Sequence, residues 1–211
     1  YLVTVTATDS ANAPLRGSVS FTVTVAGGLF LSMTGSSPLT GTFGTANSTL
    51  TTVSGAGGLF PYIYAITVPS PLPNGMTIGA STGVIAITAL TPSGNYPITV
   101  TGSDAAVPQV SGSVSFSLNH ALQMTATSSA NAAFGVASNV RTITATGGTS
   151  TISYATPTTG FTVNSSGVVN YGGSLAAGTY DVIVNATDTG TAVGATGFAT
   201  GTITISVTIT P

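Results

Sequence analysis

Three copies of one nine-residue stretch limit the fold of this chain more than any other feature of its sequence. They span residues 1–9, 96–104 and 180–188 and share the pattern Tyr-x-[Val/Ile]-x-Val-x-[Ala/Gly]-[Thr/Ser]-Asp. Apolar residues at every second position line one face of an extended strand, so the pattern predicts a half-buried β-strand that ends in a turn at the Asp. A second alternating run follows each copy, at residues 19–25, 114–118 and 203–209. The sequence therefore predicts the same β-hairpin three times.

The spacing of the copies sets the size of the repeated unit. Asp9, Asp104 and Asp188 lie 95 and 84 residues apart, which suits a β-sandwich domain and exceeds the ~20–50 residues of a solenoid repeat. Two complete units are predicted, at residues 27–119 and 120–211. Residues 1–26 match only the last two strands of a unit. We interpret them as the C-terminal strand pair of a preceding, incomplete repeat, and the chain as a fragment of a longer protein.

The composition favours strands and excludes several classes of partner. Only 3% of the residues are charged, with two Arg, four Asp and neither Lys nor Glu, whereas ordinary domains carry about 25% charged residues. The abundant Thr and Val favour strands over helices. A net charge of −2 provides no basic surface for nucleic acid or anionic lipid. No apolar run reaches the ~20 residues that span a bilayer, and the absence of Cys excludes disulfides and thiolate metal sites.

The front halves of the two units also correspond, which predicts a Greek-key sandwich of seven short strands in each. The corresponding pairs share an aromatic residue or a glycine at the same place in the unit. They are Phe43 and Phe134, Gly44 and Gly135, Gly57 and Gly147, Gly58 and Gly148, and Tyr64 and Tyr154.

Four segments of the first unit carry a family resemblance. They are Gly-Gly-x-x-Pro-Tyr-x-Tyr at 57–64, Leu-Pro-x-Gly-Met-Thr-Ile at 72–78, Ser-Thr-Gly-Val-Ile at 81–85 and the Gly-x-Tyr to Asp strand at 94–104. In this order they resemble the bacterial "putative Ig" repeats of the cadherin-like, dystroglycan-type β-sandwich group. The resemblance implies an all-β chain of tandem Ig-like or cadherin-like Greek-key sandwiches. It also implies an extracellular or cell-surface location.

The repeated Asp allows two interpretations. In cadherin-like modules an acidic residue at this strand end can bind calcium between domains, so Asp9, Asp104 and Asp188 are candidate calcium ligands. Calcium takes about six to eight oxygens, usually from several carboxylates, and Asp181 is the only other acid. A turn cap needs one carboxylate and no metal. The sequence favours turn caps, which require no cofactor. Calcium binding is the alternative.

Tyrosine and histidine at strand ends are interpreted as structural. Tyr96 and Tyr180 each follow a Gly by two residues at the start of the penultimate strand, the place of a tyrosine corner, whose phenol bonds to backbone across a loop. His120 lies at the junction of the two units without a second His, a Cys or a nearby acid, so it forms neither a metal site nor a catalytic dyad. No Gly-x-Ser-x-Gly nucleophile elbow is found. No catalytic residue is predicted, and the chain is not expected to be an enzyme.

Three Asn-x-Ser/Thr triplets are candidate glycosylation sites, at Asn47, Asn164 and Asn185. In a chain so rich in Ser and Thr such triplets also arise by chance. If the protein is exported by a cell that glycosylates, attached sugars would solubilise a surface that charge does not.

The lack of charge predicts self-association. Natural sheets protect their edges with Lys and inward-pointing charges, and this chain has no Lys. We therefore expect a segment of a cell-surface fibre, sheath or surface-layer element, or an adhesin stalk, whose partner is itself or a neighbouring repeat. The alternative is a spacer or carbohydrate-binding module of a secreted multidomain enzyme or adhesin, with surface glycans as partners.

Overall fold

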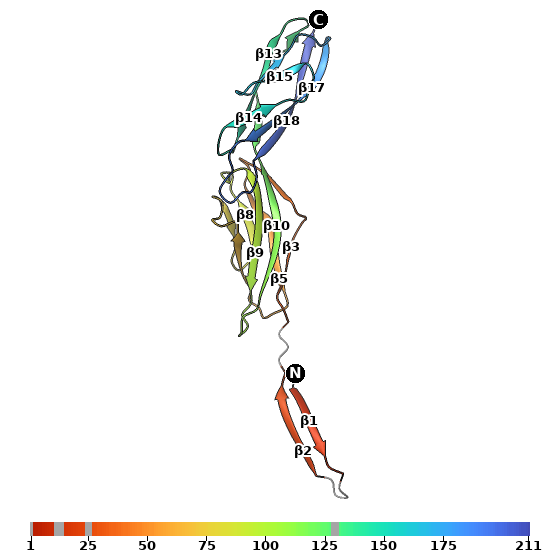
Figure 1. The fold of residues 1–211 in the computed structure, drawn as a ribbon, viewed down its shortest axis with the longest axis vertical. Coiled ribbons are helices and arrows are strands. Elements are labelled where there is room, and N and C mark those ends of the chain that lie inside the picture. The colour runs from red at the N-terminus through yellow and green to blue at the C-terminus, as the bar shows by residue number, and fades with distance from the viewer. Residues whose placement is uncertain (1, 11–14, 24–26, 128–130) are drawn as a thin grey trace.

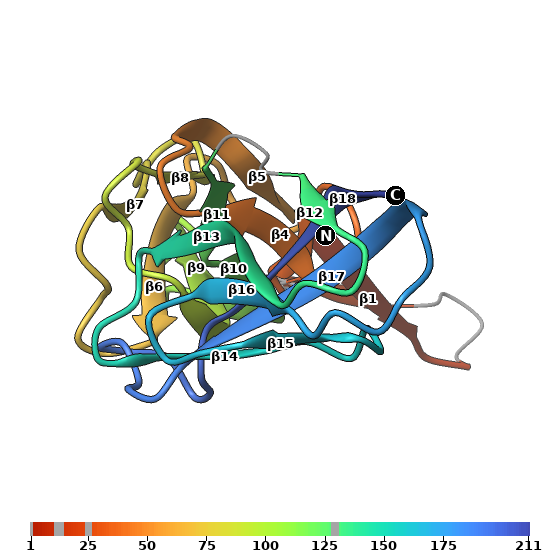
Figure 2. The ribbon, with the colours of Figure 1, turned by 90° about the horizontal axis from the view of Figure 1, so that it is seen from above.

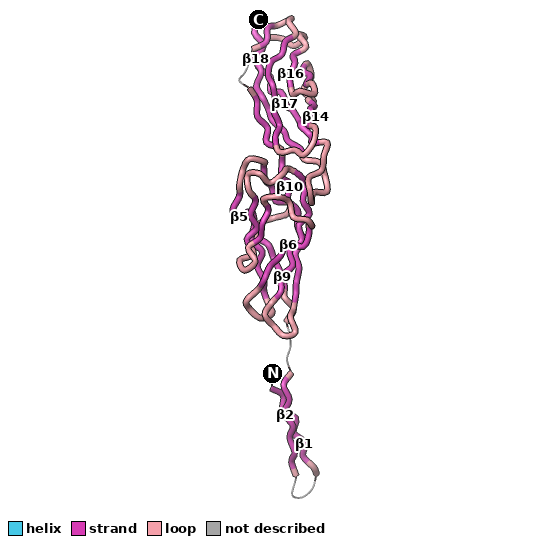
Figure 3. Tube along the Cα trace, turned by 90° about the vertical axis from the view of Figure 1, so that its left-hand side faces the viewer, coloured by secondary structure: helices cyan, strands magenta, loops and turns pink. Residues whose placement is uncertain are grey.

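The computed structural model describes residues 2–10, 15–23, 27–127 and 131–211, and all the regular structure in these ranges is β-strand. An N-terminal hairpin is followed by two β-sandwiches stacked end to end (Figure 1). The described residues in Figure 3 are coloured only as strands and loops. Seen from above, the two sandwiches overlap, as expected for bodies stacked along one axis (Figure 2). Within the described ranges no helix is long and apolar enough to cross a membrane.

The hairpin pairs β1 (Leu2–Thr8) with β2 (Arg16–Thr22) in antiparallel register. Val3 lies opposite Phe21, and Val5 lies opposite Val19. The predicted start of this strand at Tyr1, the middle of the predicted turn and the predicted boundary at residue 26 lie outside the described residues.

The first sandwich contains two four-stranded sheets, ordered β4-β10-β9-β6 and β3-β5-β8-β7. Valine, isoleucine and aromatic side chains at alternate positions point between the sheets and form one core, which includes Val53, Ile85, Ile98, Val100 and Phe116. The strands are β3 (Phe30–Met33), β4 (Leu39–Thr42), β5 (Asn47–Ala56), β6 (Ile63–Val68), β7 (Met76–Ile78), β8 (Val84–Ile87), β9 (Gly94–Ser103) and β10 (Ser111–Ala121).

The second sandwich repeats this arrangement, with sheets ordered β11-β13-β16-β15 and β12-β18-β17-β14. Its core includes Ile143, Val169, Tyr171, Val182 and Val207. The strands are β11 (Gln123–Ala126), β12 (Ala132–Ala133), β13 (Ser138–Thr146), β14 (Ile152–Ala155), β15 (Phe161–Val163), β16 (Val168–Tyr171), β17 (Gly178–Asp188) and β18 (Thr200–Thr210).

The first two strands of each sandwich belong to different sheets. In the first sandwich β3 pairs with β5 and the next strand, β4, runs parallel to β10 in the opposite sheet. In the second, β11 pairs with β13 and β12 runs parallel to β18. This split gives eight strands in each sandwich where the sequence predicts seven. The fold class, all-β with Ig-like or cadherin-like sandwiches, is confirmed by these sheets.

Candidate functional site

The most distinctive contact in the structure is the joint at which the second sandwich meets the first. A loop at residues 189–199, between β17 and β18, extends from the second sandwich onto the first. Ala192 is buried in the core of the first sandwich, and Ala195 packs against that core beside Gly94. The Thr196 amide donates to the carbonyl of Asn95 at 2.8 Å, and Asn95 forms an antiparallel bridge with Gly197. The loop therefore adds a short stretch of β-structure across the joint.

A second set of contacts crosses the joint at the turn between β13 and β14. The Ser93 amide donates to the carbonyl of Gly147 at 3.0 Å across the joint, and within the first sandwich the Ser93 hydroxyl donates to the carbonyl of Ala121 at 2.9 Å. The Phe43 ring lies directly against Gly147, where an added Cβ would overlap it. A side chain at position 147 would displace this ring, so the glycine allows the two sandwiches to approach closely.

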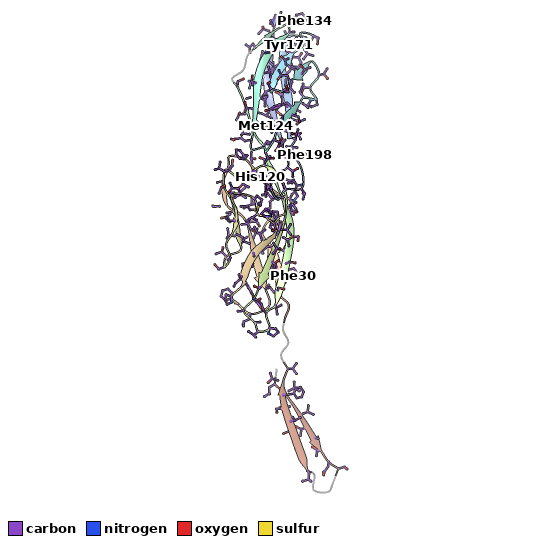
Figure 4. All side chains as sticks on the ribbon, turned by 60° about the vertical axis from the view of Figure 1, so that its left-hand side comes forward. Phe30, His120, Met124, Phe134, Tyr171 and Phe198 are labelled. Carbon is purple, nitrogen blue, oxygen red and sulfur yellow. The ribbon has the colours of Figure 1, made fainter. Side chains whose placement is uncertain are left out.

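His120 lies within the joint, where Figure 4 places it between the two sandwiches together with Phe198. The ring is buried, and its Nδ1 lies 3.0 Å from the carbonyl of Pro92, an arrangement that requires Nδ1 to carry the hydrogen. Burial lowers the pKa of His120, while the carbonyls of Pro92 and Thr42 oppose this shift. A cavity of about 270 Å³ borders His120, and its other lining residues are Gly94, Asn95, Asn119, Ala121, Phe198, Ala199 and Thr200. These neighbours supply no acid or base that could act with the imidazole.

The two predicted tyrosine-corner residues bond to the backbone four residues before them. The Tyr96 hydroxyl donates to the carbonyl of Pro92 at 2.7 Å, and the Tyr180 hydroxyl donates to the carbonyl of Ala176 at 3.0 Å. Burial raises the pKa of Tyr96 to about 12, so this phenol keeps its hydrogen at any physiological pH. Tyr171, which the sequence analysis does not single out, makes a similar bond to the carbonyl of Leu175 at 2.7 Å.

Asp104 lies at the base of the first sandwich, where its carboxylate joins two loops. It accepts hydrogen bonds from the amides of Val110 at 2.8 Å and Ala106 at 3.2 Å on its own loop, and from Leu59 at 2.9 Å on the loop between β5 and β6. The Val110 and Leu59 bonds hold the pKa of Asp104 below its usual range, against a smaller opposing effect of burial.

Asp188 occupies the corresponding place at the base of the second sandwich. Its carboxylate accepts from the amides of Thr149 at 2.6 Å, Ser150 at 3.0 Å and Gly190 at 3.0 Å, and from the Thr149 hydroxyl at 3.1 Å. Burial opposes ionisation of Asp188, but the Thr149, Gly190 and Ser150 bonds together hold its pKa below the usual range. Asp9 accepts from the Leu15 amide at 3.0 Å in the hairpin loop.

These aspartates do not form a cluster that suits calcium. Within the ranges that the structure covers, no three His, Cys, Asp or Glu side chains group closely enough to hold a metal ion. Asp104 and Asp188 lie at the bases of different sandwiches, and each is surrounded by amide hydrogens, whose positive ends disfavour a cation. Calcium takes about six oxygens or more, and among the described residues neither base brings two further His, Cys, Asp or Glu side chains to its aspartate.

The three candidate glycosylation residues are exposed. The side-chain oxygens of Asn47 and Asn164 accept hydrogen bonds from nearby amides, those of Thr49 and Ser166, both at 3.0 Å. The Asn185 oxygen accepts from the Thr202 hydroxyl at 2.9 Å. The three lie on β5, in the turn before β16 and on β17, so the structure does not bring them together.

The sequence analysis missed the residues that make the joint, apart from His120. The available signal was the length of the loop after the repeated Asp. Residues 105–110 separate Asp104 from β10, whereas residues 189–199 separate Asp188 from β18. The longer loop is the one that reaches the neighbouring sandwich.

Comparison with known proteins finds cadherin structures at low sequence identity and low TM-score. No protein-family model matches the sequence, and no curated protein matches it. Among solved structures, domains EC22–24 of mouse cadherin-23 are 16% identical with a TM-score of 0.39, over 99% of this chain and 74% of that one. The protocadherin gammaB7 EC3–6 cis-dimer structure is 19% identical with a TM-score of 0.40, over 99% and 59%. The protocadherin GammaB4 extracellular domain is 18% identical with a TM-score of 0.39, over 100% and 39%.

Proposed function

We propose that this chain is a segment of a structural, adhesive extracellular repeat protein whose sandwiches are joined directly into a stiff rod. The observation that carries the proposal is the joint itself, where Ala192 of the second sandwich is buried in the core of the first. Backbone hydrogen bonds cross the joint at Ser93 and Thr196. Contacts of this kind fix the orientation of one body on the next without a bridging ion. The rod provides length and spacing, which is what a fibre, sheath or stalk requires.

Domain organisation and the aspartates are part of the same proposal. The units are residues 27–119 and 120–211, with residues 1–26 as the last strand pair of a preceding repeat. The hydrogen bonds at Asp9, Asp104 and Asp188 support a role as turn caps. Calcium is the alternative for these residues. Tyr96 and Tyr180 support the loops at the opposite end of each sandwich.

The proposal predicts a rod whose stiffness does not depend on calcium. Small-angle X-ray scattering and electron microscopy of the chain should give the same maximum dimension and the same narrow range of inter-sandwich angles with EGTA and with calcium. Rods that bend on chelation and stiffen when calcium returns would contradict the direct joint and assign the aspartates to the metal.

A substitution can disrupt the joint while leaving both sandwiches folded. Ala192→Asp places a charge in the apolar contact and should release the 189–199 loop, widening the range of inter-sandwich angles while both cores stay folded. Ala105→Asp, in the exposed, shorter loop at the base of the first sandwich, is the matched control and should leave the angles unchanged. Equal behaviour of the two variants would argue against a joint held by the loop.

The second candidate is a spacer or carbohydrate-binding module. Exposed aromatic rings at the base of the first sandwich, those of Phe30 and Phe60, favour it, because sugars stack on such rings. Binding of surface glycans that is lost in Phe60→Ala, with no association of the chain with itself, would support this candidate over the structural one.

A further inference from the structure

We propose that Asn74 is a site of spontaneous covalent modification, at which the side-chain amide is lost and a carboxylate takes its place. The reacting groups are the backbone nitrogen of Gly75 and the side-chain amide of Asn74, and water is the only other reactant. The modification requires no partner protein, and its chemistry does not depend on the proposed rod.

The sequence singles out Asn74 among the asparagines, which belong to the chemically labile residues of proteins. It is the only asparagine in the chain that is followed by glycine. A side chain on the following residue crowds the approach of that residue's nitrogen to the asparagine amide, and glycine has no side chain. Attack within the chain is therefore least hindered at Asn74.

Asn74 and Gly75 occupy the two central positions of a turn that leads into β7. The Met76 amide donates to the Pro73 carbonyl at 3.2 Å and closes the turn. Pro73 is buried and Met76 is 2% exposed, so these two residues anchor the turn to the first sandwich. Asn74 is exposed between them. Water therefore reaches the side-chain amide of Asn74 in the folded chain.

The backbone nitrogen of Gly75 is the nucleophile, and the fold leaves it available. No described residue accepts a hydrogen bond from the Gly75 amide, whereas the Gly75 carbonyl accepts one from the Thr88 amide at 3.0 Å. Rotation of the peptide between Asn74 and Gly75 toward the side chain therefore sacrifices no hydrogen bond of this amide.

Two other exposed asparagines, Asn47 and Asn164, differ from Asn74 in both respects. Each is followed by Ser, and their side-chain oxygens accept hydrogen bonds from the amides of Thr49 and Ser166, both at 3.0 Å. The Asn74 side chain has no hydrogen bond with any described residue. Asn47 and Asn164 are therefore internal references for a slower reaction.

The reaction has two steps. The Gly75 nitrogen forms a bond to Cγ of Asn74 and gives up its hydrogen, and the side-chain nitrogen leaves as ammonia, so that a five-membered cyclic imide remains. Water then adds to one of the two imide carbonyls and opens the ring. Cleavage of the bond between Cγ and nitrogen gives aspartate, whereas cleavage of the original peptide bond gives isoaspartate, whose main chain runs through the side-chain methylene.

The two products affect the fold differently. Both add one negative charge to a chain of net charge −2, beside β7 at the edge of its sheet. Isoaspartate also lengthens the main chain by one carbon just before Met76, which pairs with Ile87. Gly75 has little room to shift, because even an added Cβ would overlap the Thr88 hydroxyl. Isoaspartate should therefore loosen β7, whereas aspartate preserves the turn.

The test incubates the folded full chain at mildly alkaline pH in heavy-oxygen water and follows each asparagine by mass spectrometry of its peptide. Asn74→Gln is the matched variant, because attack on glutamine must close a larger ring, which forms more slowly. A parallel incubation of the wild type in denaturant measures the rate that the local sequence gives without the fold. Electron-transfer fragmentation distinguishes aspartate from isoaspartate at residue 74.

In the folded chain Asn74 should convert at least about tenfold faster than Asn47 or Asn164, and no slower than about a tenth of its rate in denaturant. Each converted residue should carry one heavy oxygen, both products should be present, and Asn74→Gln should stay unmodified. An Asn74 that reacts no faster than the two references, or that reacts only in denaturant, overturns the proposal. The stiffness of the rod is measured on unmodified chain, so the proposed function is judged separately.

The consequence for the fold has its own measurement. Ion exchange separates the modified chains by their added charge, and Asn74→Asp serves as the reference for the aspartate product. The isoaspartate form should unfold at a lower temperature than Asn74→Asp. Equal thermal midpoints would contradict the loosening of β7.

Discussion

The hairpin β1–β2 and the strand pair β9–β10 are nearly the same sequence in two different surroundings. Gly-Ser-Val-Ser-Phe occurs at 17–21 and again at 112–116. The registers are equivalent, since Val3 pairs with Phe21 as Ile98 pairs with Phe116. Phe21 is nevertheless 48% exposed and Phe116 only 6%. The same local sequence therefore gives the same pairing, while the opposing sheet decides burial.

The loop that closes each hairpin also combines local contacts with contacts that depend on the surroundings. The Leu15 amide donates to the Asp9 carboxylate at 3.0 Å, and the equivalent Val110 amide donates to Asp104 at 2.8 Å. Both bonds are local and form in both surroundings. The bond from Leu59 to Asp104 at 2.9 Å comes from another strand pair, so it depends on the complete sandwich.

Amide hydrogen exchange should show the largest difference between the two hairpins. A two-stranded hairpin is marginally stable in water, whereas core strands open only with free energies that approach global unfolding. The amides of β9 and β10 should therefore exchange at least about a thousandfold more slowly than those of β1 and β2. Similar exchange rates would mean that the hairpin is covered in solution by a partner.

Matched phenylalanine truncations should show the next largest effect. Phe116→Ala removes a buried ring and should lower the free energy of unfolding by about 3–5 kcal/mol. Phe21→Ala removes an exposed ring and should change it by less than about 0.5 kcal/mol. Denaturant unfolding of the full chain measures both. A large loss in Phe21→Ala would contradict the exposed placement of the hairpin.

Acid should destabilise the sandwiches through their aspartates. The pKa values of Asp104 and Asp188 lie below the ordinary value in the folded chain, so the unfolded chain binds protons more readily. Their stabilising contribution is therefore complete above the unfolded pKa of about 4 and is lost as pH falls through the folded values.

The thermal midpoint should accordingly fall below about pH 4. Asp188→Asn should lower the midpoint at neutral pH and reduce this acid dependence, with Asp9→Asn as the control in the exposed hairpin. If Asp9→Asn reduced the acid dependence as much as Asp188→Asn, the aspartates of the sandwiches would not be its source.

Calcium should have the smallest effect, and the same effect on both hairpins. Because amide hydrogens surround the carboxylates of Asp104 and Asp188, millimolar calcium should shift the thermal midpoint by less than about 1 °C. A calcium titration followed by NMR should leave the amide chemical shifts of Leu59 and Val110 unchanged. Saturable shifts at these amides would show that the metal displaces the caps.

How much of this fold the sequence predicts depends on how far apart in sequence the interacting residues lie. The alternating strands, the hairpin registers and the sandwich class follow from residues close in sequence, because strand period and turn chemistry are local. The Tyr96 and Tyr180 hydroxyls bond to backbone carbonyls only four residues away, so these contacts are also local. The split of the first strand between two sheets was missed, because it depends on pairing with β10 and β18 at the other end of each unit.

The contacts of the joint were missed for the same reason, although the length of the 189–199 loop was a signal. Nothing near Gly147 in sequence indicates that Phe43 will lie against it, about a hundred residues away. The 189–199 loop is rich in small residues, which ordinarily indicate an exposed turn. Its role depends on the shape of the neighbouring sandwich, and that shape is not encoded in the loop.

The parallel pairs β4–β10 and β12–β18 have a consequence for a chain under tension. Once force along the rod has detached β3 or β11 from its neighbour, it draws β4 or β12 and the last strand of the same sandwich in opposite directions. The bonds between these two strands are then loaded in shear and must break together. Four residue pairs, from Leu39 with Leu118 to Thr42 with Ala121, share this load in the first sandwich. Two pairs, Ala132 with Ile209 and Ala133 with Thr210, share it in the second. Under a steady pull the second sandwich should therefore yield first, lengthening the chain while the first sandwich stays intact.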